Sequence, residues 1–115
     1  MEQSILGDMR ALLIGNASDT SFDTDLIIHI NMVIDVLYQL GIGPKGFSIS
    51  GDTSKWGDLL GSNTQLEAVK TYMYLKIRKV FDPPQSATTI EALNSSINEL
   101  EWRLNITVDP EQEDN

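Results

Sequence analysis

The chain has a single histidine, His29, which follows Asp25 by four residues, about one turn of a helix. A carboxylate at that distance can orient an imidazole as a general base. No nucleophile or metal signature accompanies the pair: there is no cysteine, and no GxSxG, HExxH, Walker or GxGxxG pattern occurs. A solvated or interface histidine is the simpler interpretation, and we do not expect an enzyme.

Two further patterns resemble ligand sites. Asp19, Asp23 and Asp25 lie close together, but the turn glycine and the distal glutamate of a calcium-binding EF-hand are missing. The glycine-rich segment 41–46 includes Lys45, yet it follows an expected helix instead of a strand and lacks the phosphate-loop spacing. Loop and helix-cap duties explain both patterns, so we expect no metal and no cofactor.

A basic cluster gathers Lys70, Lys76, Arg78 and Lys79 near the end of one expected helix. Such a cluster can contact DNA, or it can complement the negative end of the helix dipole. The net charge of −9 disfavours nonspecific binding of nucleic acid. A small DNA-binding regulator remains an alternative, as does an acidic inhibitor that imitates DNA, although the carboxylates are dispersed except at residues 109–115.

The elements that would position these residues are helices. Apolar spacing of 3 and 4 residues predicts helices over about Gln3–Leu13, Thr24–Leu40 and Asn63–Phe81, and a fourth that ends at Leu104. Asp23 is expected to cap the second helix, Ser62 with Gln65 the third, and Thr88 with Glu91 the fourth, while Gly41 and Pro83-Pro84 end the helices before them. The chain of 115 residues is therefore expected to form one mainly α domain, a small bundle of about four helices.

Two segments depart from this helical pattern. Phe47 to Ser50 alternates like a half-buried strand, which predicts a protruding β-loop at about residues 45–52, followed by a short helical turn that contains Trp56. After Leu104 the periodicity fails, so residues 106–115 are expected to form an extended, acidic C-terminal arm outside a helical domain of residues 1–105. The apolar runs are far shorter than the roughly 20 residues of a membrane span, and we expect no membrane segment.

The strongest signal is a surplus of apolar surface. Ile28, Met32 and Val36 form a second stripe on the polar side of the second helix, and Trp102 lies nearly opposite the apolar seam of the last helix. Another segment of the same chain or a neighbouring subunit could cover these residues, because soluble proteins avoid large exposed apolar patches.

The chain resembles the small head–tail connector proteins of tailed bacteriophages, also called adaptor or head-completion proteins. The resemblance spans about residues 4 to 106 and rests on the order of DTDLIIHIN, GFSI, WGDLLG, LEAVKTYMYLKIRKVFDPP and INELEWRL. It implies a non-enzymatic virion protein of the head–tail junction, present in the host cytoplasm during assembly.

The resemblance also implies partners. Such proteins form a ring, commonly of twelve subunits, beneath the portal protein; the ring extends the DNA channel without binding DNA specifically and offers a platform to the next tail or stopper protein. A closed ring needs two different patches on each subunit. The candidate contact residues for subunits and partners are Ile28, Met32, Val36, Phe47, Ile49, Trp56, Tyr74, Phe81, Trp102, Ile106 and Val108.

Overall fold

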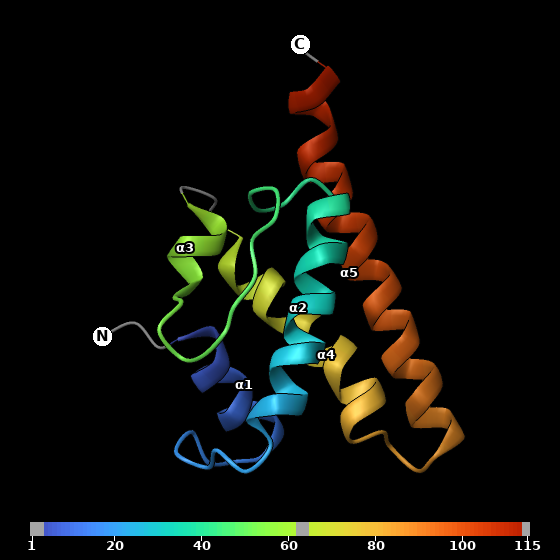
Figure 1. Ribbon diagram of the computed structural model, residues 1–115. Coiled ribbons are helices and arrows are strands. Elements are labelled where there is room, and N and C mark those ends of the chain that lie inside the picture. The colour runs from blue at the N-terminus through green and yellow to red at the C-terminus, as the bar shows by residue number, and fades with distance from the viewer. Residues whose placement is uncertain (1–3, 62–64, 114–115) are drawn as a thin grey trace.

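The computed structural model describes residues 4–61 and 65–113, and the side chains among them as far as Asn105. Within these ranges the fold consists of helices, as expected (Figure 1), and it has no strand beyond an isolated bridge between Ser4 and Lys55. The helices are α1 (Ile5–Leu13), α2 (Asp23–Gln39), α3 (Trp56–Leu60), α4 (Leu66–Phe81) and α5 (Ala87–Glu113).

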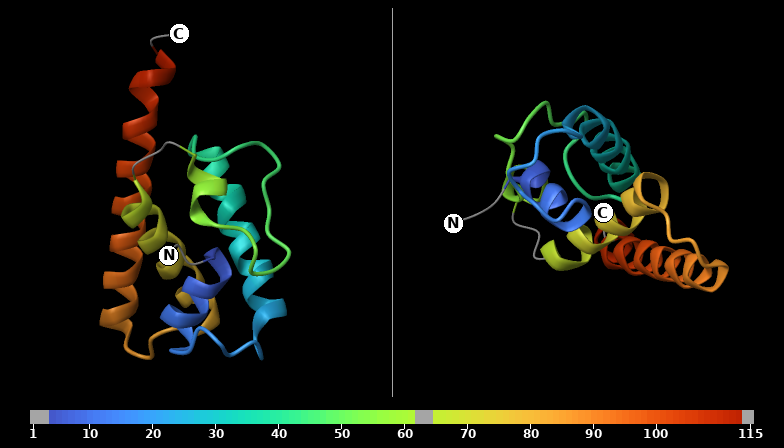
Figure 2. Two further views of the ribbon diagram at one scale, coloured as in Figure 1. Left: turned by 90° about the vertical axis from the view of Figure 1, so that its left-hand side faces the viewer. Right: turned by 90° about the horizontal axis from the view of Figure 1, so that it is seen from below.

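Helix α4 is the centre of the bundle. It packs against α1, α2 and α5 (Figure 2), which explains why its apolar residues spread around much of its circumference. The core is contributed by all five helices and by two residues of the connection between α2 and α3: Ile5, Leu6, Met9, Leu26, Ile30, Val33, Ile34, Leu37, Ile42, Ile49, Trp56, Leu59, Val69, Tyr72, Met73, Ile77, Leu93, Ile97 and Leu104.

The start of α2 differs from the prediction. The N-cap is Phe22, whose side chain makes no cap hydrogen bond, and Asp23 is the first helical residue. The Asp23 carboxylate instead accepts two hydrogen bonds from the buried guanidinium of Arg10, at 2.8 Å from Nε and 2.6 Å from Nη2. A bidentate, charge-assisted pair outweighs a helix cap, so Asp23 ties α2 to α1.

This ion pair predicts an acid-dependent loss of stability. The hydrogen bonds from Arg10 hold the pKa of Asp23 below its usual range. In the unfolded chain the Asp23 carboxyl has a pKa of about 4. The stabilisation is therefore complete above the unfolded-state pKa and is lost as the pH falls through the lower folded-state pKa. We expect Asp23→Asn to lower the free energy of unfolding by about 2 kcal/mol at pH 7. Urea titrations at a series of pH values should show this difference shrinking in acid; a constant difference would contradict the assignment.

The end of α2 and the segment after it confirm one prediction and correct another. Gly41, at φ 96°, follows the C-cap Leu40, and the N–H groups of Gly41 and Ile42 donate to the carbonyls of Tyr38 and Leu37. These are the two bonds of a Schellman motif. The predicted β-loop is not found, because the described backbone of residues 45–52 pairs with no strand.

A side chain takes the place of the missing strand partner. The amide of Asn31 on α2 accepts from the Ile49 N–H at 2.8 Å and donates to the Ile49 carbonyl at 3.0 Å. The alternation does separate the inner from the outer side of the segment, since Ile49 is buried while Ser48 and Ser50 are exposed. An amide can satisfy both backbone groups of one residue, which removes the need for a second strand here.

Removing this anchor should loosen the segment locally. Asn31→Ala is expected to destabilise the protein by about 1–2 kcal/mol, because it leaves the backbone groups of buried Ile49 unpaired. Asn31→Asp is the matched variant, since it keeps the acceptor for the Ile49 N–H and replaces the donor to the Ile49 carbonyl with a carboxylate oxygen. Amide hydrogen exchange of Ile49 should accelerate more in the alanine variant. Equal protection in both variants and the parent protein would refute the anchor.

The C-terminal end is also different from the prediction. Helix α5 continues to Glu113 and extends past the other helices (Figure 1), so an extended arm from residue 106 is wrong. A helix that has formed gains one hydrogen bond for each added residue, and a short β-branched stretch does not by itself end it. The residue that caps the start of α5 is Ser86 and not Thr88, since the Ser86 hydroxyl accepts a hydrogen bond from the Thr89 N–H. The predicted cap at Ser62 lies outside the described residues.

Candidate assembly interface

Large hydrophobic side chains stay exposed on four helices of the described structure. They are Leu12 on α1, Phe22 directly before α2, Ile28, Met32 and Tyr38 on α2, Val80 on α4, and Trp102 on α5. Ile28, Met32 and Trp102 are 53%, 61% and 64% exposed, so neither the N-terminal helix nor the 45–52 segment covers the second stripe. Coverage by another described segment of the same chain is therefore wrong for these three residues.

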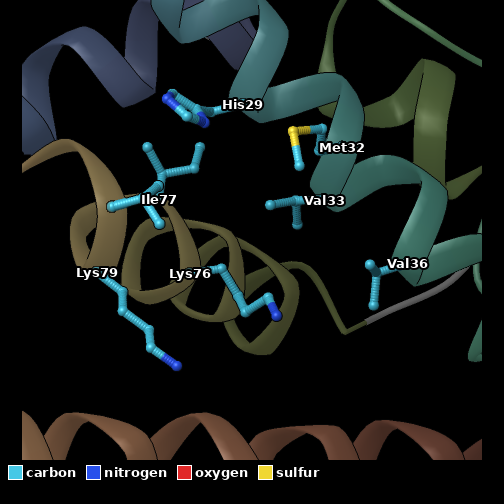
Figure 3. Close-up of a pocket in the computed structure, with 8 residues that line it drawn as sticks. His29, Met32, Val33, Val36, Lys76, Ile77 and Lys79 are labelled. Carbon is cyan, nitrogen blue, oxygen red and sulfur yellow. The ribbon is translucent and has the colours of Figure 1, made fainter.

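A groove of about 230 Å³ runs between α2 and α4 (Figure 3). Buried Val33 and Ile77 lie at its base, and Met32 and Val80, each 61% exposed, belong to its walls. The remaining lining residues are His29, Val36, Lys76 and Lys79. The groove is thus apolar inside, with two cationic side chains along one edge (Figure 3).

A wider and more polar hollow of about 560 Å³ continues from the groove toward the end of α1. The two share His29 and Val80 as lining residues. Phe22 and half-buried Phe81 meet edge to face in its wall, with ring centroids 5.6 Å apart. One continuous furrow therefore follows the contact between α2 and α4.

The predicted contact residues fall into four groups. Ile28, Met32 and Trp102 are exposed; Val36, Phe47, Tyr74 and Phe81 are half-buried. Ile49 and Trp56 belong to the subunit core and not to its accessible surface, because Asn31 draws Ile49 inward and Asp8 accepts a 2.7 Å hydrogen bond from the Trp56 indole. Ile106 and Val108 lie on helical α5 and not on an extended arm, beyond the last residue whose side chain the structure describes.

The basic cluster on α4 is largely committed within the chain. Lys70 lies 3.2 Å from the Asp8 carboxylate and over the ring of Trp56. Lys76 lies 3.8 Å from Glu101, and Arg78 donates to the Tyr74 hydroxyl. Of the four, Lys79 alone has no ion pair or hydrogen bond in the described part of the chain, so a continuous DNA-binding face has no support here.

The candidate chemistry around His29 does not assemble. No hydrogen bond joins His29 to Asp25 within the described residues, and both side chains line the polar hollow. The same residues contain no group of three or more histidine, cysteine, aspartate or glutamate side chains that could hold a metal ion. His29 instead lies where the apolar groove meets the more polar hollow, and it lines both.

Sequence reasoning missed Arg10, Asn31 and the groove itself. Arg10 was hidden because its partner Asp23 is distant along the chain, and Asn31 resembles any polar residue on a solvent-facing arc. Val80 could have been found, since it follows buried Ile77 by three residues and so continues the same helix face.

The exposed side chains of Met32 and Val80 gather at one groove, and apolar patches of this kind mark contact sites for other molecules. A model of the phage connector protein family matches residues 5–111. The chain therefore belongs to the phage connector family, a family of structural proteins, which makes it a virion component. Searches of curated proteins and of solved structures found no match. None of the described helices is long and apolar enough to cross a bilayer.

Proposed function

We propose that the protein is an adaptor subunit that assembles into a ring beneath the portal, extends the DNA channel and offers a docking platform to the next tail or stopper protein. The observation that carries the proposal is the distribution of exposed apolar side chains over α1, α2, α4 and α5. A protein that bound one partner would need one such patch, whereas a ring subunit needs two for its neighbours and more for the components above and below.

The charge supports a channel that lets DNA slide. The net charge of −9, with most basic residues of α4 paired inside the subunit, leaves little cationic surface to hold phosphates. An acidic wall repels DNA and keeps it from sticking. Twelve subunits, as in the proteins that the chain resembles, are our proposed ring size.

Segment 47–50 is our candidate for contact with a partner by strand addition. Asn31 holds both backbone groups of Ile49 on the inner side, while Ser48 and Ser50 are exposed. An extended peptide of the portal or of a neighbour could pair with that free backbone edge. Half-buried Phe47 would then lie beside the added strand.

The mass of the purified protein, alone and with the portal protein of the same genome, tests the proposal. We expect a defined oligomer on the portal, with or without a free monomer. Ile28→Asp should impair this assembly while leaving the monomer folded, because it places a charge on an exposed apolar position. Ser18→Asp, which adds the same charge at an exposed polar position of the loop before α2, is the control. Absence of any complex with the portal would contradict the function.

A further inference from the structure

Trp102 is a large aromatic side chain that the described structure leaves mostly uncovered. It is 64% exposed, whereas Leu93, Ile97 and Leu104 of the same helix are buried. At about 100° per residue, Trp102 lies on the side of α5 opposite to these three and points away from the bundle. It cannot fill a groove of its own subunit.

A polar amide and a carboxylate flank this tryptophan. Asn98 and Glu99 precede it by four and three residues, about one helical turn, and both are exposed. Glu99 pairs with Arg103, but the two side chains are 58% and 64% exposed, so water weakens this pair. The Glu99 carboxylate therefore remains accessible to a second cation. The outer face of α5 presents an aromatic knob beside an exposed anion.

The groove between α2 and α4 matches that face in size and polarity. Its base and walls are apolar, and its volume of about 230 Å³ is large enough for an indole ring. Lys79 at its edge is exposed and has no ion pair within the described residues. The groove thus offers an apolar hole beside a free cation, where α5 offers an apolar knob beside an exposed anion.

The two helices that would meet also have opposite charge. Helix α4 has four basic residues and one acidic residue, Glu67, whereas α5 has six acidic residues and one basic residue, Arg103. Within one subunit, Lys76 and Glu101 form the ion pair between α4 and α5 in the described part of the chain. A neighbouring α5 is therefore a better electrostatic partner for the edge of α4 than any other helix of the chain.

We propose that the groove between α2 and α4 receives Trp102 of a second copy of this chain, with Glu99 of that copy placed against Lys79. The inference rests on the proposed function, and it specifies which two faces of the subunit meet. Because knob and groove are different patches, the contact is heterologous and repeats around a ring. A buried aromatic anchor in an apolar pocket is the arrangement that dominates the affinity of protein interfaces.

Site-directed cross-linking tests this pairing directly. The chain contains no cysteine, so each introduced thiol is unique. Two single-cysteine proteins, Lys79→Cys and Asn98→Cys, are mixed, assembled with the portal protein and treated with a short bismaleimide. We expect a cross-linked dimer in the mixture and little in either protein alone, since a heterologous contact brings residue 79 of one copy to residue 98 of another. Glu67→Cys, exposed on the first turn of α4, replaces Lys79→Cys as the matched control and should give no dimer.

Two further experiments separate the anchor from the charges. Trp102→Ala in both cysteine proteins should weaken association about 30-fold or more, as expected for an aromatic hot spot, and abolish the cross-link. Circular dichroism should show an unchanged fold, because the side chain is exposed. Without introduced cysteines, Lys79→Glu and Glu99→Lys should each weaken assembly, and the two together should restore it.

The outcomes distinguish the pairing from the function. Assembly on the portal without a 79–98 cross-link, or a charge exchange that fails to restore assembly, overturns the groove pairing and leaves the adaptor role intact. An amine-to-carboxyl reagent on the unaltered protein should join Lys79 to Glu99 of another copy, as identified by mass spectrometry. A link from Lys79 to the acidic residues after 105 instead would assign the groove to that segment and overturn Trp102 as its occupant. Absence of any assembly overturns both.

Discussion

Replacing Trp56 with alanine is expected to lower the free energy of unfolding by about 4 kcal/mol, the largest effect of any single substitution proposed for this protein. The side chain is 2% exposed and connects three helices. Its indole donates a 2.7 Å hydrogen bond to Asp8 on α1, and Lys70 of α4 lies 5.6 Å from the ring centroid. The substitution leaves a cavity and also removes the hydrogen-bond donor of Asp8.

The second tryptophan is the matched control for this experiment. Trp102→Ala removes the same side chain from an exposed position and should change stability by less than about 0.5 kcal/mol. Urea unfolding followed by far-ultraviolet circular dichroism measures both variants without depending on tryptophan fluorescence. Similar stability losses in the two variants would contradict the assignment of Trp56 to the core and Trp102 to the surface.

Removing the Arg10 guanidinium should have the next largest effect. Arg10→Ala is expected to destabilise the protein by about 3 kcal/mol, because the side chain is 7% exposed and makes three hydrogen bonds, two to Asp23 and one to the Ala17 carbonyl. Asp23 is 25% exposed, so water can compensate part of the loss at that carboxylate. The expected loss of stability therefore falls at the lower end of the range for a broken buried ion pair.

A double-mutant cycle separates the ion pair from the packing. Arg10→Met keeps most of the apolar stem, and Asp23→Asn removes the charge of the partner. If the pair acts as a unit, the double variant should lose clearly less stability than the sum of the two single losses. Additive losses, measured by urea unfolding at pH 7, would show that the contact in the structure does not stabilise the fold.

Much of the helical architecture could be predicted from local pattern. The apolar periodicity located α1, α2, α4 and α5 to within a few residues at most of their ends, because helix formation and burial of one face depend on neighbours three and four positions away. Gly41 ended α2 as expected, since the Schellman turn requires a positive φ that glycine adopts without strain.

Long-range partners decided two of the features that the pattern misassigned, the role of Asp23 and the pairing of segment 47–50. Aspartate is a common N-cap residue, which favours a cap at Asp23, yet Arg10 lies close enough in space to bind the Asp23 carboxylate. Segment 47–50 alternates as a strand does, yet the side chain of Asn31 occupies the place where a strand would pair. In both cases a local hydrogen bond competes with a hydrogen bond to a residue that is distant in sequence. Residue type allows either bond, so the sequence does not show which one forms.

The sequence by itself determined the class of fold, the surplus of apolar surface and the lack of a recognisable catalytic motif, because these follow from residue type and periodicity. Only the tertiary structure decided which apolar residues are buried in the core and which stay exposed. Burial depends on which helices meet: α1, α3 and α4 enclose Trp56, while Trp102 stays largely exposed on the outer side of α5. The groove between α2 and α4 likewise exists only because two helices distant in sequence pack side by side and leave Met32 and Val80 uncovered.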